Sequence, residues 1–245
     1  MNIKIKKLII GLLIITLVSP LAVLMLNGTF IRTYAEDPRP KSDFYAYYNI
    51  SESQRDYIKD LIEMGYPLEK IQVGYAFIYD RFGKLEHLKS ILEKESQGES
   101  WASVFEAYDL TYGIFQPTSF DSDSLDTLMQ SHLSSDEIMI IDRIAFASEE
   151  AFDVLMIQVM EGTSFEEIID ALELVGHIKL YPRVQVTEEV LNHYQNQYAL
   201  EDMQIIEAMV IAEKLDLNEK NILESTAQGM TEYEILGYYL QEIFE

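Results

Sequence analysis

The residues of this chain that could do chemistry are few, and most lack the spacing that a site requires. The four histidines share no metal-ligand spacing, and the absence of cysteine excludes thiol catalysis and thiolate metal sites. The acidic run DSDSLD (121–126) is not a calcium loop, because Leu125 occupies a ligand position and Asp126 replaces the required glycine. We therefore predict no metal and no cofactor. The remaining candidate is Glu95, which lies upstream of the string YGIFQ (112–116).

The surroundings of Glu95 resemble lysozyme-like lytic transglycosylases in three places, namely Glu95-Ser96, YGIFQ and Pro117-Thr118. The resemblance implies that Glu95 would protonate a glycosidic oxygen, with a pKa raised by an apolar pocket. Against it, the family's later Ala-Tyr-Asn-x-Gly segment has no match, and Thr226 takes the place of Glu95 in a second copy of the segment. A peptidoglycan lytic enzyme that uses Glu95 is kept as the alternative hypothesis, and zymography of Glu95→Gln would decide it.

The helices that would position these residues belong to a unit that occurs three times. The string KSILEKESQG (89–98) recurs as KNILESTAQG (220–229), and between them VLMIQVMEG (154–162) matches at an offset of about 64. A second long string, YPLEKIQVGYAFIYDRF, recurs from residue 198 onward. Three copies of a unit of about 65 residues are therefore predicted, at about 51–113, 118–176 and 186–245.

A glycine followed two positions later by a helix-capping residue marks most joints between the predicted helices. Glycine closes one helix because it adopts the left-handed conformation without steric cost. The capping residue then begins the next helix. Capping boxes are predicted at Ser134–Glu137, Ser164–Glu167 and Thr231–Glu234. The four predicted hinge glycines are Gly65, Gly98, Gly162 and Gly229.

The pattern predicts an all-α protein of about twelve short helices, because apolar residues recur at helical spacing and strand signals are almost absent. A helical hairpin of this size cannot bury its apolar face alone. We therefore expect three four-helix repeats stacked as an α-solenoid-like array, with a compact helical bundle as the alternative. The hinge ILEKESQGESWASVFEAYDL (91–110) resembles helical hairpins of uncharacterised secreted proteins of Firmicutes, a resemblance that implies no activity.

The first 35 residues have the pattern of a secretory signal. Three lysines precede an apolar run from Leu8 to Leu26, and TYA at 33–35 offers a cleavage site. We predict a signal peptide at 1–35 or, alternatively, an uncleaved anchor. A linker at 36–50 and a helical-repeat domain at 51–245 are expected to follow. The protein is then expected to be secreted or associated with the cell surface.

The chain is strongly acidic beyond residue 35, with 14 basic and 42 acidic residues and a net charge of −28. Such a charge repels nucleic acid and anionic lipid. We therefore expect no nucleic-acid partner, and membrane contact only through an uncleaved N-terminal segment. The partner that this charge favours is a protein or peptide of cationic character.

Aromatic side chains offer a possible binding surface, predicted to include Trp101, Tyr108, Tyr238 and Tyr239. Together with the repeats and the lack of a catalytic set, they favour a non-enzymatic extracytoplasmic protein. Its predicted role is to bind or assemble proteins or peptides at the bacterial cell surface. A structural spacer, anchored by an uncleaved N-terminal helix, is a second alternative.

Overall fold

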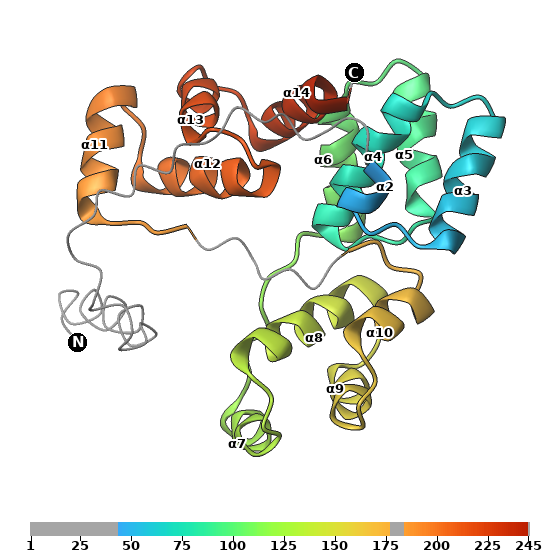
Figure 1. Ribbon diagram of the computed structural model, residues 1–245. Helices are drawn as coiled ribbons and strands as arrows, with labels where there is room; N and C mark the ends of the chain where they lie inside the picture. The colour runs from blue at the N-terminus through green and yellow to red at the C-terminus, as the bar shows by residue number, and fades with distance from the viewer. Residues whose placement is uncertain (1–43, 177–183, 245) are drawn as a thin grey trace. The chain divides into compact units, whose positions relative to one another are not determined.

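The computed structural model describes residues 44–176 and 184–244, without the side chains of residues 123–125 and 129. This described part contains thirteen helices and no β-strand, so the prediction of an all-α protein is confirmed (Figure 1). The predicted signal peptide at 1–35 lies outside the described residues. The helices are α2 (Phe44–Tyr47), α3 (Glu52–Glu63), α4 (Leu68–Arg81), α5 (His87–Ser96), α6 (Trp101–Tyr112), α7 (Ser122–Gln130), α8 (Ser135–Ser148), α9 (Phe152–Met160), α10 (Phe165–Ala171), α11 (Glu188–Tyr198), α12 (Asp202–Leu215), α13 (Glu219–Ala227) and α14 (Glu232–Phe244).

Four helices lie in each of the three ranges that the sequence defines. The first segment, residues 51–113, contains α3 to α6, and the middle segment, residues 118–176, contains α7 to α10. The third segment, residues 186–245, contains α11 to α14. Helices at the same place in two segments are called equivalent, so that α5, α9 and α13 are equivalent, and so are α6, α10 and α14.

Reciprocal hydrogen bonds begin three of these helices as predicted. The backbone N–H of Glu137 donates to Ser134 Oγ at 3.2 Å, while the Ser134 N–H donates to the Glu137 carboxylate at 2.7 Å. Ser164 and Glu167 make the same pair before α10. Thr231 makes it with the glutamate three residues later, before α14. The three capping boxes are confirmed, and they satisfy N–H groups that have no partner inside the helix.

The four hinge glycines lie between helices with left-handed backbones. The φ angles of Gly65, Gly98, Gly162 and Gly229 are +98, +93, +97 and +87°. A Cβ at any of them would meet nothing within 4 Å, so the backbone conformation alone favours glycine there. The helices α4, α8 and α12 also end at a left-handed residue, but one with a side chain: Phe82, Glu149 and Asp216.

The first and third segments share one hydrophobic core. Helix α14 packs against α4 and against its own equivalent, α6 (Figure 1). Gly237 allows the close approach of α14 to α6, because a Cβ there would lie 3.0 Å from Trp101 Cβ and 3.3 Å from the Ala102 nitrogen. On either side of this contact, Ile235 and Leu240 are buried.

Residues 44–50 also belong to this core, although the sequence places them in a linker. Phe44, Tyr48 and Ile50 are buried. The Phe44 ring makes edge contacts with Tyr75 and Phe244, at centroid distances of 5.4 and 5.9 Å. The predicted linker at 36–50 is therefore wrong for its last seven residues. Burial of their apolar side chains stabilises this segment against the core.

The middle segment has a core of its own, formed by side chains such as Ile141, Ile144, Leu155 and Ile168. Phe82 is the residue of the first segment that joins it. In a solenoid each repeat contacts only its neighbours in the chain. The contacts do not confirm such an array, because the first and third segments pack directly on each other and the middle one does not lie between them.

Backbone hydrogen bonds connect the middle segment to the first. The Val175 N–H donates to the Gly83 carbonyl at 2.7 Å, and the Leu85 N–H donates to the Glu173 carbonyl at 3.0 Å. Between them an isolated antiparallel bridge pairs Lys84 with Leu174. The turn after α4 therefore holds the end of the middle segment.

Candidate binding surface

Glu95 lies on α5 with its carboxylate engaged by a lysine of α4. Lys70 Nζ donates to the two Glu95 oxygens at 2.5 and 2.7 Å. A glycosidase acid needs an apolar pocket that keeps its proton on at neutral pH. Here the carboxylate faces the ammonium group of Lys70 instead of an apolar wall. The geometry therefore offers the enzymatic alternative no support.

The string YGIFQPTS forms the connection between the first and middle segments. Tyr112 ends α6 with its ring stacked on His87, at a centroid distance of 4.0 Å. Further along, the Thr118 N–H and hydroxyl both donate to the Asp142 carboxylate at 2.7 Å, which fixes the connection to α8. His87 Nδ1 lies 3.0 Å from the Tyr108 hydroxyl, and burial lowers the pKa of this histidine.

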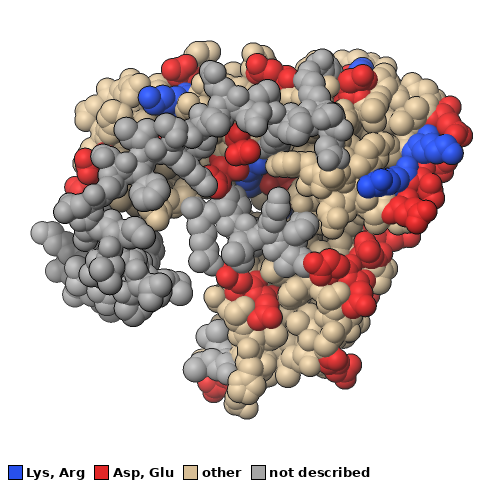
Figure 2. Space-filling view, viewed as in Figure 1, with Lys and Arg blue, Asp and Glu red and all other residues tan. Residues whose placement is uncertain are grey.

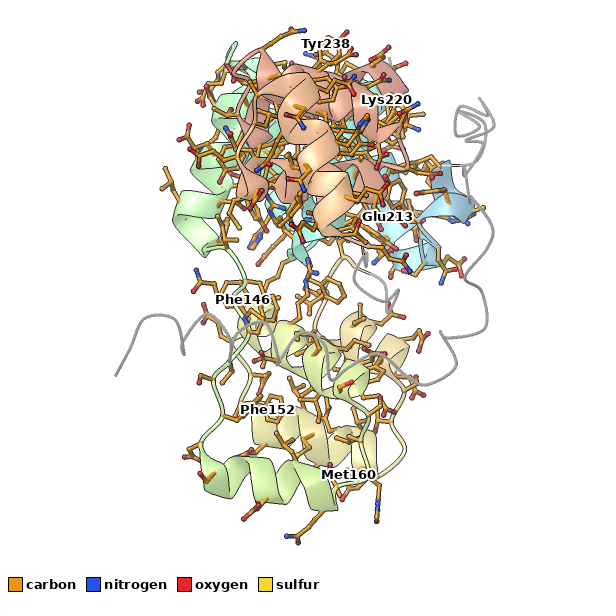
Figure 3. The ribbon with its side chains drawn as sticks, turned by 90° about the vertical axis from the view of Figure 1, so that its left-hand side faces the viewer. Phe146, Phe152, Met160, Glu213, Lys220 and Tyr238 are labelled. Atoms are coloured by element: carbon orange, nitrogen blue, oxygen red, sulfur yellow. The ribbon has the colours of Figure 1, made fainter. Side chains whose placement is uncertain are left out.

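The predicted aromatic binding surface is wrong for three of its four residues. All three are buried. Trp101 lies at the contact of α6 with α14, the Tyr108 ring packs against Phe77 of α4 and His87 of α5, and the Tyr239 hydroxyl lies against α13. The Tyr239 hydroxyl donates to the Asn221 carbonyl at 3.1 Å and needs no water partner. Only Tyr238 of the four is exposed, at 56%. Figure 3 shows it at the outer edge of α14.

Arg81 at the end of α4 is the centre of an ionic cluster that the sequence did not suggest. Its guanidinium binds the Asp109 carboxylate in bidentate fashion at 2.9 to 3.1 Å. It also contacts Asp80 at 2.6 Å and Glu232 of α14 at 3.1 Å. Lys214 of α12 reaches Asp80 at 3.0 Å. The cluster therefore ties the first segment to the third, with Asp109 buried and Arg81 largely buried at its centre and Glu232 exposed at its edge.

The charged groups of the cluster shift one another's pKa values. Burial alone would raise the pKa of Asp80, but Lys214, Arg81 and Arg143 outweigh it and hold that pKa below its usual value. Burial and the Asp109 carboxylate raise the pKa of Tyr233 to about 12, and its hydroxyl donates to Asp109 at 3.1 Å. The charged groups of the cluster are therefore paired with one another across the contact between the segments.

The outer face of α9 carries three exposed apolar side chains. Val154, Ile157 and Met160 are 46, 50 and 53% exposed. Their spacing of three residues places them along one side of the helix. The inner side carries Leu155 and Met156, which are buried in the core of the middle segment. Figure 3 labels Phe152 and Met160 at the two ends of this helix. Helix α9 is therefore apolar on both sides.

The equivalent helices show that this outer face is a property of the sequence and not of the architecture. The buried pair Leu155–Met156 corresponds to Ile91–Leu92 in α5 and to Ile222–Leu223 in α13. The outward positions are exposed in all three helices. Where α9 has Val154, Ile157 and Met160, the residues are Ser90, Glu93 and Ser96 in α5 and Asn221, Glu224 and Ala227 in α13.

The charges around α9 differ in the same way. The middle segment contains fourteen acidic residues and one basic residue, Arg143. Arg143 donates to the Asp80 carbonyl and its guanidinium lies 4.7 Å from the Phe82 ring centroid, so it is held at the contact with the first segment. On the face shown in Figure 2, carboxylates and no lysine or arginine appear over α8 to α10. The middle segment therefore carries a large excess of negative charge.

Sequence reasoning missed the α9 face, although the repeats contain the information. The string VLMIQVMEG matches the other two repeats at its inward apolar pair and its glycine, whereas its outward positions differ from theirs. Lining up the three glycines Gly98, Gly162 and Gly229 would have placed Ile157 opposite Glu93 and Glu224. An apolar residue at a position that is elsewhere polar is the signal that could have found it.

No family model, curated protein or solved structure matches the chain. Among the described residues, no cluster of three or more His, Cys, Asp or Glu side chains could hold a metal ion. In the same part of the chain, no helix is both long and apolar enough to cross a membrane.

Proposed function

We propose that this protein is a non-enzymatic, extracytoplasmic module that binds or assembles proteins or peptides at the bacterial cell surface, and that it does so through the outer face of α9. The observation that carries the proposal is the exposure of Val154, Ile157 and Met160 at positions that are polar or small in both equivalent helices. The extracytoplasmic location rests on the predicted signal at 1–35.

Single exposed apolar residues are common on soluble proteins and need no explanation. Three exposed apolar residues along one side of a helix, present in only one of three related segments, do need an explanation. The first and third segments carry serine, glutamate, asparagine or alanine at these positions, so polar or small residues are compatible with this helical unit. Folding of the unit does not need apolar residues at these positions, so a binding function would account for their presence in the middle segment alone.

A photo-crosslinking experiment on intact cells tests the proposal. A photoreactive amino acid at position 157 is expected to form a covalent adduct with an envelope protein or peptide. The same amino acid at position 93, the exposed equivalent on α5, is the matched control and should form none. Mass spectrometry would identify the adduct.

Two results would contradict the proposed function. One is the absence of any adduct from position 157 in cells that produce and export the protein. The other is an equal set of adducts from positions 157 and 93, which would show random encounter instead of a binding face. N-terminal sequencing of the exported form tests the location separately, because a start at Glu36 would remove the anchored-spacer alternative.

A further inference from the structure

We infer that the partner of the α9 face is a cationic amphipathic helix, whose apolar side lies on Val154, Ile157 and Met160 and whose Lys or Arg side chains reach Asp153 and Glu161. This inference rests on the proposed function and names the chemistry of the partner. Four observations support it: the apolar spacing, a reversed charge on the same face, the acidic surroundings and the internal control that α5 and α13 provide.

A reversed charge distinguishes α9 from both of its equivalents. Asp153 occupies the position of Lys89 in α5 and Lys220 in α13. In α5 this lysine faces Glu93 one turn later, at 3.9 Å. In α9 the same two positions hold an aspartate and Ile157, so the cation is missing and the anion has become apolar. A partner that supplies both a cation and an apolar group complements these two changes.

The spacing of the apolar residues selects a helix as the shape of the partner. Side chains at positions 154, 157 and 160 form a ridge about 9 Å long, since a helix rises 1.5 Å per residue. Such a ridge packs between the side chains of a second helix, as in other complexes that bind an amphipathic helix by its apolar side. Asp153 and Glu161 lie beyond the two ends of the ridge in the sequence and are exposed. They can each accept a hydrogen bond from a basic residue of the partner.

Charge argues against the other occupants of an apolar face. A second copy of this chain would bring two middle segments together, each with fourteen acidic residues and one basic residue. Those charges repel each other at close range. Helices that lie on membranes carry Lys and Arg beside their apolar side, and none flanks this face. A positively charged partner is the occupant that the face attracts.

Fluorescence anisotropy with three synthetic peptides tests the inference on the purified protein. The first is an amphipathic peptide of leucine and lysine, with leucines at i, i+3, i+4 and i+7. In the second, glutamate replaces each lysine, and the third has the composition of the first without an apolar side. We expect the first to bind and the others to bind at least about tenfold more weakly. Its affinity should fall between about 0.1 M and about 1 M salt, where the screening length shortens from about 10 to about 3 Å.

Two variants locate the binding site. The triple variant Val154→Ser, Ile157→Gln, Met160→Ser removes the apolar ridge without changing the charge, and should weaken the peptide at least about tenfold. Asp153→Lys restores the residue of the other two segments, and should weaken binding and reduce its salt dependence. The matched control is Ser90→Ala, Glu93→Gln, Ser96→Ala on α5, which should leave the affinity within about twofold. Circular dichroism would verify that each variant is folded.

Several results would overturn the inference. Equal binding of the lysine and glutamate peptides would refute a cationic partner, and an unchanged affinity in the triple variant would place the peptide elsewhere. Self-association, or binding to lipid vesicles, that the triple variant loses would identify a second copy or a membrane as the occupant. If position 157 still forms its specific adduct on cells, the proposed function survives each of these failures. If that adduct is missing while the peptide binds to α9, the proposed function fails by itself.

Discussion

The first and middle segments are built from the same four-helix unit, but they use its surface differently. In the first segment α6 has twelve residues and packs along α14, which has thirteen. The equivalent α10 of the middle segment has seven residues and ends where the chain returns to the turn after α4. The middle segment therefore cannot make the contact that joins the other two, and its core stays separate.

The residues on the outer side differ in polarity between equivalent helices of the same unit, whereas those on the inner side do not. The inward pair of α5, α9 and α13 is apolar and buried in every segment. The outward positions are polar or small where the segments pair with each other, and apolar in the segment that stands without such a partner. Folding thus explains the apolar residues on the inner side of the helix, but not those on the outer side of α9.

The largest expected effect comes from breaking the ionic cluster between the first and third segments. We expect Arg81→Met to lower the free energy of unfolding by about 3–5 kcal/mol, because it leaves the buried Asp109 carboxylate with the Tyr233 hydroxyl alone among the cluster's groups. Urea denaturation would measure the loss. As a control, Lys59→Ala breaks an exposed pair with Glu63 at 3.9 Å and should cost less than about 1 kcal/mol. Similar losses in both variants would refute the role of the cluster.

The next largest effect concerns the helix contact that the middle segment lacks. We expect Gly237→Ala to destabilise the protein by about 1–2 kcal/mol, because the new Cβ would meet Trp101 Cβ at 3.0 Å. The better helix propensity of alanine offsets part of this cost. Differential scanning calorimetry would measure the change.

The matched control for that variant is a glycine with free space around it. Gly162→Ala meets nothing within 4 Å, but its φ of +97° costs a residue with a side chain about 1 kcal/mol. A stabilised Gly237→Ala variant would show that α6 and α14 can move apart at no cost. The close contact between the first and third segments would then not be what holds them together.

Local patterns in the sequence predict the helices but not how they pack. Helical periodicity and local capping gave the all-α class and the capping boxes, because both depend on residues within one or two turns. The pairing of α6 with α14 depends on residues more than 120 positions apart, such as Trp101 and Gly237, and no local pattern encodes it. For the same reason the burial of Trp101, which the sequence places on a binding surface, is not predictable from a local pattern.

The two candidate surfaces, the aromatic one and the α9 face, differ in how far the sequence can predict them. Aromatic composition is a weak guide, since aromatic residues serve cores and binding surfaces alike. The replacement of polar by apolar residues in α9 can be found from the sequence alone, because the three repeats act as an internal control for one another. What the sequence could not supply was the exposure of Ile157 and the burial of its neighbour Met156, which decide the side of the helix.

A smaller effect is expected from pH at the same cluster. The pKa of Asp80 is held below its usual value, so its contribution to stability is present above about pH 4 and is lost as the pH falls through the folded-state pKa. Asp80→Asn should therefore be less stable than the wild type at pH 7, and the difference should shrink below about pH 4. Urea denaturation across this range would measure it, and a constant difference would contradict the assignment.

The smallest expected effect is also the one that separates the two sides of α9. The triple variant Val154→Ser, Ile157→Gln, Met160→Ser should change the free energy of unfolding by less than about 0.5 kcal/mol, because these side chains are about half exposed and have polar equivalents. By contrast, Leu155→Ala on the inner side should cost about 2–5 kcal/mol. A large loss in the triple variant, measured by urea denaturation, would mean that the outer face serves folding, and the middle segment would no longer differ from the first.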